Sequence, residues 1–160
     1  MSAPVELADV AAWRGNWAWG VPLILLTTMI HVLGLGLINE RMVHWLEGRA
    51  DNRDITPLFA MAMSVVVLLA TLLHGLEAVL WAVAYLLLGA LPDPRAAMLY
   101  SLAALTTYGH ANVFLASHWR LLGALEALNG MLLFGLTTAF LFSMIQRVWP
   151  LGSRARRPRS

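Results

Sequence analysis

The sequence contains no cysteine and no lysine, and it has few charged residues of either sign. The absence of cysteine excludes disulfides, thiolate zinc or iron–sulfur sites and a cysteine nucleophile. Charged residues make up 12% of the chain, whereas ordinary soluble domains carry about 25%. Hydrophobic residues make up 59%. This composition leaves too little polar surface for a soluble domain and predicts a membrane protein that contacts lipid.

The sequence also lacks the short motifs that carry common enzyme chemistry. It has no HExxH metal motif, no glycine-rich phosphate loop and no nucleophile elbow. We therefore expect a protein that is not an enzyme and that carries no cofactor.

The positive charge comes entirely from arginine, and four of the eleven arginines lie in the last seven residues. An arginine cluster after an apolar helix is typical of the cytoplasmic flank of a membrane span, where it also contacts anionic lipid. We therefore interpret residues 150–160 as a basic cytoplasmic tail. Membrane lipid is an expected partner, and nucleic acid is not.

The first long apolar run extends from Trp19 to Ile38. As a helix it measures about 30 Å, which matches the hydrocarbon thickness of a bilayer. Tryptophans crowd its start, as they do at membrane interfaces. We predict that residues 1–18 form an extracytoplasmic or interfacial segment. Residues 19–56 are then the first transmembrane helix and a charged cytoplasmic loop.

The second apolar run, residues 57–91, includes only two residues that can carry charge, His74 and Glu77. A helix of this length measures about 50 Å, which is more than one crossing requires. Either two short spans meet at a turn formed by residues 74–77, or one long helix tilts or protrudes from the bilayer. The turn is only weakly polar, which favours one long helix.

A proline-rich break separates this run from a shorter helix. Asp93 is a good N-cap and Pro94 fits the first helical position, so the pattern predicts a helix over residues 94–105. At about 18 Å this helix is too short to cross a bilayer. The strip that follows, residues 106–118, is polar and irregular, and the last apolar run, residues 119–149, is again long enough to span.

An irregular strip beside a half-length helix cannot face lipid, because its backbone groups would lack hydrogen-bond partners. It must be buried in protein or line a watery cavity. The arginine counts predict a cytoplasmic C-terminus, so the last helix crosses inward and the half-helix enters from the outer side. The predicted fold is an all-α membrane protein with three transmembrane helices and a re-entrant pore half-helix. The alternative for the strip is an interfacial loop with a purely structural role.

The residues around the half-helix resemble a known family. Residues 100–112 read YSLAALTTYGHAN, which is similar to the pore helix and filter of the potassium-channel superfamily, where a Thr-Thr pair leads into Thr-Val-Gly-Tyr-Gly-Asp. Residues 119–147 resemble the inner helix of small bacterial two-pore-domain-like ion channels. The resemblance extends from Asp93 to Arg147 and rests on the order of elements more than on any one motif.

This resemblance implies an assembly and a function. Residues 57–149 would form a pore domain with outer helix 57–91, pore helix 94–105, filter-like strip 106–112 and inner helix 119–149. Four copies would surround one axis, and backbone carbonyls of the strip would replace the hydration shell of a permeant monovalent cation, potassium or sodium. The implied protein is a homotetrameric cation channel, or a non-conducting homologue, in a bacterial inner membrane.

The implied filter departs from the family pattern where selectivity is decided. Tyr108 stands in place of valine, His110 in place of tyrosine, Ala111 in place of glycine and Asn112 in place of aspartate. Glycine there supplies backbone angles that are costly for alanine, and histidine titrates near neutral pH. Potassium selectivity is thus in doubt, and a weakly selective, pH-sensitive or non-conducting pore is expected. The implied site residues are the filter residues Thr106, Thr107, Tyr108, Gly109, His110, Ala111 and Asn112, and the inner-helix hinges Gly130 and Gly135.

Polar side chains inside the apolar helices are further candidates for function. His74 and Glu77 are three residues apart and share a helix face, as do Glu126 and Asn129. Such pairs bind metal, relay protons, or hydrogen-bond across packed helices and fix the assembly. His31 together with His74 raises the possibility of a b-type haem held between two helices. The alternative function is therefore a haem- or metal-binding membrane subunit.

Overall fold

The computed structural model describes residues 3–48, 55–109 and 112–154, and in these ranges every regular element is a helix. The elements are α1 (Ala3–Glu47), α2 (Ile55–Leu87), α3 (Pro94–Leu105), the 3-10 turn η1 (Ser117–Trp119) and α4 (Arg120–Arg154). Three of them, α1, α2 and α4, are long and apolar enough to cross a membrane. This confirms the prediction of a multi-pass membrane protein built from three spans.

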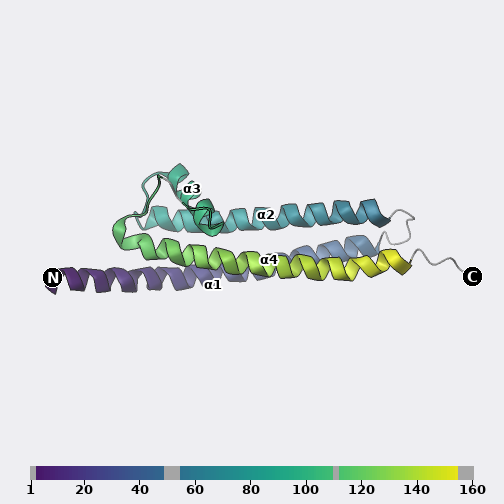
Figure 1. Ribbon diagram of the computed structural model, residues 1–160, viewed down its shortest axis with the longest axis horizontal. Coiled ribbons are helices and arrows are strands. Elements are labelled where there is room, and N and C mark those ends of the chain that lie inside the picture. Colours follow the sequence, from purple (N-terminus) through teal and green to yellow (C-terminus); the bar gives the residue numbers. More distant parts are fainter. Residues whose placement is uncertain (1–2, 49–54, 110–111, 155–160) are drawn as a thin grey trace, which may run out of the picture.

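The three long helices lie side by side, with α2 antiparallel to α1 and α4 (Figure 1). α4 starts at the end of the bundle where α3 lies, and the first turns of α1 extend beyond the other helices there. One narrow face of α1 is buried, and most of its remaining surface is apolar and exposed, as expected of a helix that faces lipid. The buried residues of α1 are Asn16, Gly20, Thr27, His31, Leu35 and Met42.

The short helix α3 begins at a strong cap and ends against α4. The Asp93 carboxylate accepts a hydrogen bond of 2.8 Å from the backbone N–H of Ala96, and Pro94 occupies the first turn. At the other end the carbonyl of Leu105 meets Gly130, where an added Cβ atom would lie 2.1 Å from the carbonyl oxygen. Gly130 lies ten residues after the start of α4, or about 15 Å along its axis. α3 therefore reaches from one end of the bundle deep between α2 and α4.

Two clusters of buried apolar side chains hold the helices together. The larger one joins α2, α3 and α4 and contains Trp81, Tyr85 and Leu122. The smaller one joins α1, α2 and α4 and contains Val66 and Met144. Along the helices, buried polar side chains are interposed between these two clusters.

Two of the three long helices, α1 and α4, extend further than the apolar pattern predicts, whereas α2 ends at Leu87 and not at the predicted residue 91. α1 begins at Ala3 rather than at Trp19 and continues into the predicted cytoplasmic loop, and α4 continues into the predicted tail as far as Arg154. The extra residues of α1 are mostly good helix formers. Their charged side chains oppose burial in lipid, but they do not end a helix. The apolar run therefore marked the membrane-crossing part of α1 and not its ends.

The second run is one unbroken helix. α2 passes through residues 74–77 without a turn, so the alternative of a hairpin at this place is wrong. The short helix α3 has the predicted bounds, residues 94–105, because both its cap and its first-turn proline are local signals.

Candidate functional site

Two polar contacts fix the register between α2 and α4. Tyr85 on α2 bonds to Glu126 on α4, and His74 on α2 bonds to Thr137 on α4. The two contact residues are eleven positions apart on each helix, so the antiparallel helices keep one register over about 16 Å. Buried polar side chains consequently lie in successive layers along the bundle.

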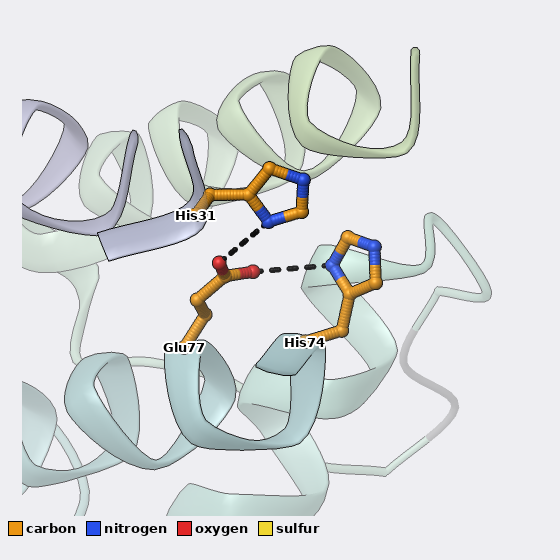
Figure 2. Close-up of side chains that lie close together, drawn as sticks. All are labelled: His31, His74 and Glu77. Atoms are coloured by element: carbon orange, nitrogen blue, oxygen red, sulfur yellow. Dashed lines mark hydrogen bonds and ion pairs between the residues drawn. The ribbon is translucent and has the colours of Figure 1, made fainter. Parts of the chain in front are cut away.

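One layer is a closed ring of four side chains contributed by all three long helices. His31 Nδ1 lies 2.7 Å from Glu77 Oε1, and His74 Nδ1 lies 3.1 Å from Glu77 Oε2 (Figure 2). The Nε2 atoms of His31 and His74 lie 3.0 and 3.1 Å from Thr137 Oγ1. His31 and Glu77 are fully buried, and His74 and Thr137 are 8% exposed. Each histidine therefore bridges the same carboxylate and the same hydroxyl.

Counting hydrogens shows how this ring is accommodated in an apolar core. Its four hydrogen bonds need four hydrogens. One arrangement is a protonated Glu77, two neutral histidines and the Thr137 hydroxyl. The other is an ionised Glu77, one imidazolium, one neutral histidine and the same hydroxyl. Both arrangements satisfy every bond and carry no net charge, which avoids the cost of an unpaired charge in the membrane interior.

A second layer surrounds Glu126, which is fully buried. The Tyr85 hydroxyl donates to Glu126 Oε2 at 2.5 Å. The Ser101 hydroxyl lies 2.5 Å from Glu126 Oε1 and 2.7 Å from the carbonyl oxygen of Ala78. A serine hydroxyl has one hydrogen and cannot donate to two acceptors. The contacts are all satisfied when Glu126 is a neutral acid that donates to Ser101, which then donates to Ala78.

A third polar contact lies between these layers. The Asn129 side-chain amide donates to Thr27 Oγ1 at 2.8 Å. Asn129 Oδ1 and Trp81 Nε1 are buried and have no hydrogen-bond partner among the described residues. Trp81 is four residues from Tyr85 on α2, and Asn129 is three residues from Glu126 on α4. Because Tyr85 bonds to Glu126, Trp81 and Asn129 lie at similar heights along the bundle.

The start of α4 is capped by a side chain of α1. Asn16 Oδ1 accepts a hydrogen bond of 2.7 Å from the backbone N–H of Leu122, in the first turn of α4. The Asn16 amide group lies 2.6 Å from the carbonyl oxygens of Ala12 and His118, to which it donates. Asn16 thus supplies from another helix the acceptor that a helix start normally receives from its own N-cap.

The predicted filter strip begins where α3 ends. The backbone N–H of Tyr108 bonds to the Ala103 carbonyl and that of Thr107 to the Ala104 carbonyl, both at 2.9 Å, the Schellman pattern of a helix end. Thr107 has a φ of 55°, a left-handed conformation that glycine usually supplies and that is costly for a β-branched residue. Gly109 also has a positive φ, of 84°. The Tyr108 side chain is 89% exposed, so the strip combines backbone strain with exposure.

The remaining filter residues are only partly described. Thr106 ends α3, and its hydroxyl donates to the Leu102 carbonyl at 2.7 Å. The Asn112 side chain is exposed. His110 and Ala111 lie outside the described residues.

The structure divides the predicted intramembrane residues between separate layers. Glu77 bonds to both His74 and His31, so these three candidates come together. Glu126 and Asn129 share a helix face but have different partners. Sequence reasoning assigned no role to the main partners of these residues, which are Thr27, Tyr85, Ser101 and Thr137. A single hydroxyl in an apolar helix is the only signal that marks them.

The two predicted hinge glycines have different surroundings. Gly130 is packed against the backbone of Leu105, so a side chain there would collide with the end of α3. Around Gly135 there is open space. A close backbone approach is therefore one physical reason for glycine at position 130.

Comparison with known proteins returned no relative. No family model, no curated protein and no solved structure matches the chain.

Proposed function

We propose that this protein is the subunit of a homotetrameric cation channel, in which α2, α3 and α4 form the wall of a central pore. The observation that carries the proposal is the start of the strip after α3, residues 106–109, which is exposed in the single chain and departs from regular structure. Thr107 and Gly109 have left-handed φ values, and Tyr108 between them is 89% exposed.

In a bilayer, the backbone groups of such a strip must be shielded from lipid. Irregular backbone at membrane depth is tolerated only where protein buries it or where it lines a watery cavity. Copies of the same chain arranged around an axis would provide both, because each strip would face the others across a hydrated path. Backbone carbonyls gathered in this way bind a dehydrated monovalent cation.

The position of α3 fits this arrangement. Its C-terminal end lies beside Gly130, about 15 Å along α4, which would bring the end of a re-entrant helix close to the middle of the span. The C-terminus of a helix carries partial negative charge. This end would therefore attract a cation in the pore.

The strained threonine is best explained by a role in the strip. Glycine at position 107 would adopt a φ of 55° without a steric penalty, so local stability alone favours glycine. Threonine adds a hydroxyl oxygen beside the carbonyls. Local strain that the rest of the fold must compensate is common at functional sites.

The permeant ion is potassium or sodium, with weak discrimination between them. Ala111 replaces a glycine that the potassium-channel pattern requires, and His110 adds a group that gains charge near neutral pH. The arginine distribution favours a cytoplasmic C-terminus, and the resemblance to small bacterial channels implies a bacterial inner membrane.

The decisive experiment measures potassium and sodium flux into liposomes that contain the purified protein, at two pH values around neutrality, with the oligomer mass measured in detergent. We expect tetramers and flux of both ions. Thr107→Gly should relieve strain of about 1 kcal/mol and yet reduce flux, whereas Thr71→Ala, which removes an exposed hydroxyl on α2, should leave flux unchanged.

Three outcomes separate the alternatives. Tetramers without flux would identify a non-conducting homologue. A monomer would contradict an axial pore altogether. If His110→Tyr combined with Ala111→Gly leaves the potassium-to-sodium ratio of a conducting protein unchanged, these residues do not line the filter.

A further inference from the structure

We infer that His31, His74 and Glu77 form a binding site for one divalent transition-metal ion of the zinc class. The proposed pore does not use these residues, so the inference stands apart from it. One ligand atom from each of the three residues lies within 4.8 Å of the others. All three residues are buried, and they come from α1 and α2 near the middle of both helices.

The orientation of the donors suits an ion. Figure 2 shows the Nδ1 atoms of His31 and His74 turned toward the two oxygens of the Glu77 carboxylate. An ion placed among them would replace the hydrogens that these atoms share. Two imidazole nitrogens and one carboxylate favour a transition-metal ion such as zinc, cobalt or nickel over magnesium and calcium, which prefer oxygen ligands alone.

Thr137 supplies the outer support that metal-bound histidines require. Such histidines nearly always give their other ring N–H to a hydrogen-bond acceptor, which fixes the tautomer and the ring orientation. The Nε2 atoms of His31 and His74 lie 3.0 and 3.1 Å from Thr137 Oγ1, and a hydroxyl oxygen has two lone pairs. One threonine can therefore hold both histidines with Nδ1 free for the ion.

The same geometry disfavours a haem. The two imidazole rings have centroids 4.9 Å apart, and their Nδ1 atoms both bond to Glu77. Haem ligation by two histidines places iron and a flat macrocycle between the rings. Here the carboxylate of Glu77 takes that position, so the cluster fits a bare ion.

A groove lies between α1 and α4, about one helical turn from His31 and Thr137. It has a volume of about 340 Å³, and its lining begins at Val32 and Leu136, next to His31 and Thr137 in the sequence. The lining continues to Asn39 and Ser143, which add polar side chains.

Metal binding changes the proton count of the cluster by one. The metal-free ring holds four hydrogens, as counted above. The metal-bound cluster holds three, one on each Nε2 and one on Thr137, with Glu77 ionised. One proton is therefore released for each ion bound. The ionisable groups that flank the cluster along the helices, Glu40 on α1, Tyr85 on α2 and Glu126 on α4, are all at least eight residues away.

The test is calorimetric titration of the purified full-length protein with zinc, in two buffers that differ in ionisation enthalpy, together with visible absorption of the cobalt form. We expect one ion per chain, one released proton per ion, and cobalt bands of a site with nitrogen and oxygen ligands. Thr137→Val, which keeps the side-chain shape, should weaken binding by about 10- to 100-fold. Glu77→Gln should weaken binding more, and Glu126→Gln, a second buried glutamate outside the cluster, should leave it unchanged.

The following results would contradict the proposed metal site. If the wild-type protein binds no stoichiometric zinc, or binds it without releasing a proton, the cluster is a hydrogen-bonded tie between helices and not a metal site. If Glu77→Gln and Glu126→Gln lose affinity equally, the ion binds elsewhere. Because proton release is measured on the wild-type protein, the test holds even where a variant folds poorly, and its result is independent of ion flux.

Discussion

Replacing Gly130 with alanine tests the contact that positions α3. The new Cβ atom would lie 2.1 Å from the carbonyl oxygen of Leu105 and 2.8 Å from its carbonyl carbon and Cα. These neighbours are backbone atoms, which cannot rotate away. The end of α3 must then move by about 1 Å, and overpacking of this kind costs about 1–3 kcal/mol.

Gly135→Ala is the matched control, because open space surrounds that position on the same helix. Both substitutions gain the same helix propensity, about 0.5–1 kcal/mol. The propensity gain cancels when the two variants are compared, so the difference between them isolates the collision. We expect Gly135→Ala to be slightly more stable than the wild type, and Gly130→Ala to be less stable than Gly135→Ala by about 1–3 kcal/mol.

The assay is unfolding in mixed micelles with increasing dodecyl sulfate, followed by far-ultraviolet circular dichroism. A lower midpoint for Gly130→Ala than for Gly135→Ala supports the close approach of α3 to α4. Equal midpoints would refute the reasoning, because backbone atoms so close to the position of an added Cβ cannot accommodate a methyl group without cost.

Three further predictions use the same unfolding assay. Asn16→Ala should lower stability by about 1 kcal/mol, because the Leu122 N–H loses its acceptor; an unchanged midpoint would mean that water replaces the cap. Glu126→Gln should change stability by less than about 1 kcal/mol, since an amide can replace a neutral acid; a loss as large as that of Glu126→Ala would show that the carboxylate is ionised. Asp93→Ala should cost about 1 kcal/mol by removing the bond to Ala96, and no loss would indicate that Pro94 alone starts α3.

The elements that the sequence predicted well are those with local signals. The start of α3 follows from Asp93 and Pro94, and the spans follow from long apolar runs. The start of α1 was missed because hydropathy records where a helix is buried in lipid. Residues 3–18 continue the helix with charged and aromatic side chains, which lower the mean hydropathy without ending the helix.

The candidate sites were predicted only in part for a related reason. His74 and Glu77 share a face at a spacing that the sequence shows directly. Their partners His31 and Thr137 depend on the register between helices, and an apolar sequence carries little information about register. Thr137 and Thr138 look alike in the sequence, yet Thr137 closes the ring while Thr138 bonds to the backbone of its own helix.

The ring of His31, Glu77, His74 and Thr137 also has a consequence for the assembly of the helices. The histidines and the glutamate lie on α1 and α2, which precede α4 in the chain, so only the hydroxyl of the ring comes from the last helix. Until α4 arrives, the two Nε2 atoms lack the partner that the finished protein gives them. The last helix therefore completes a polar site that the first two helices leave open, and docking it in any other register would leave these nitrogens unpaired. The ring therefore favours one register of α4 against α1 and α2.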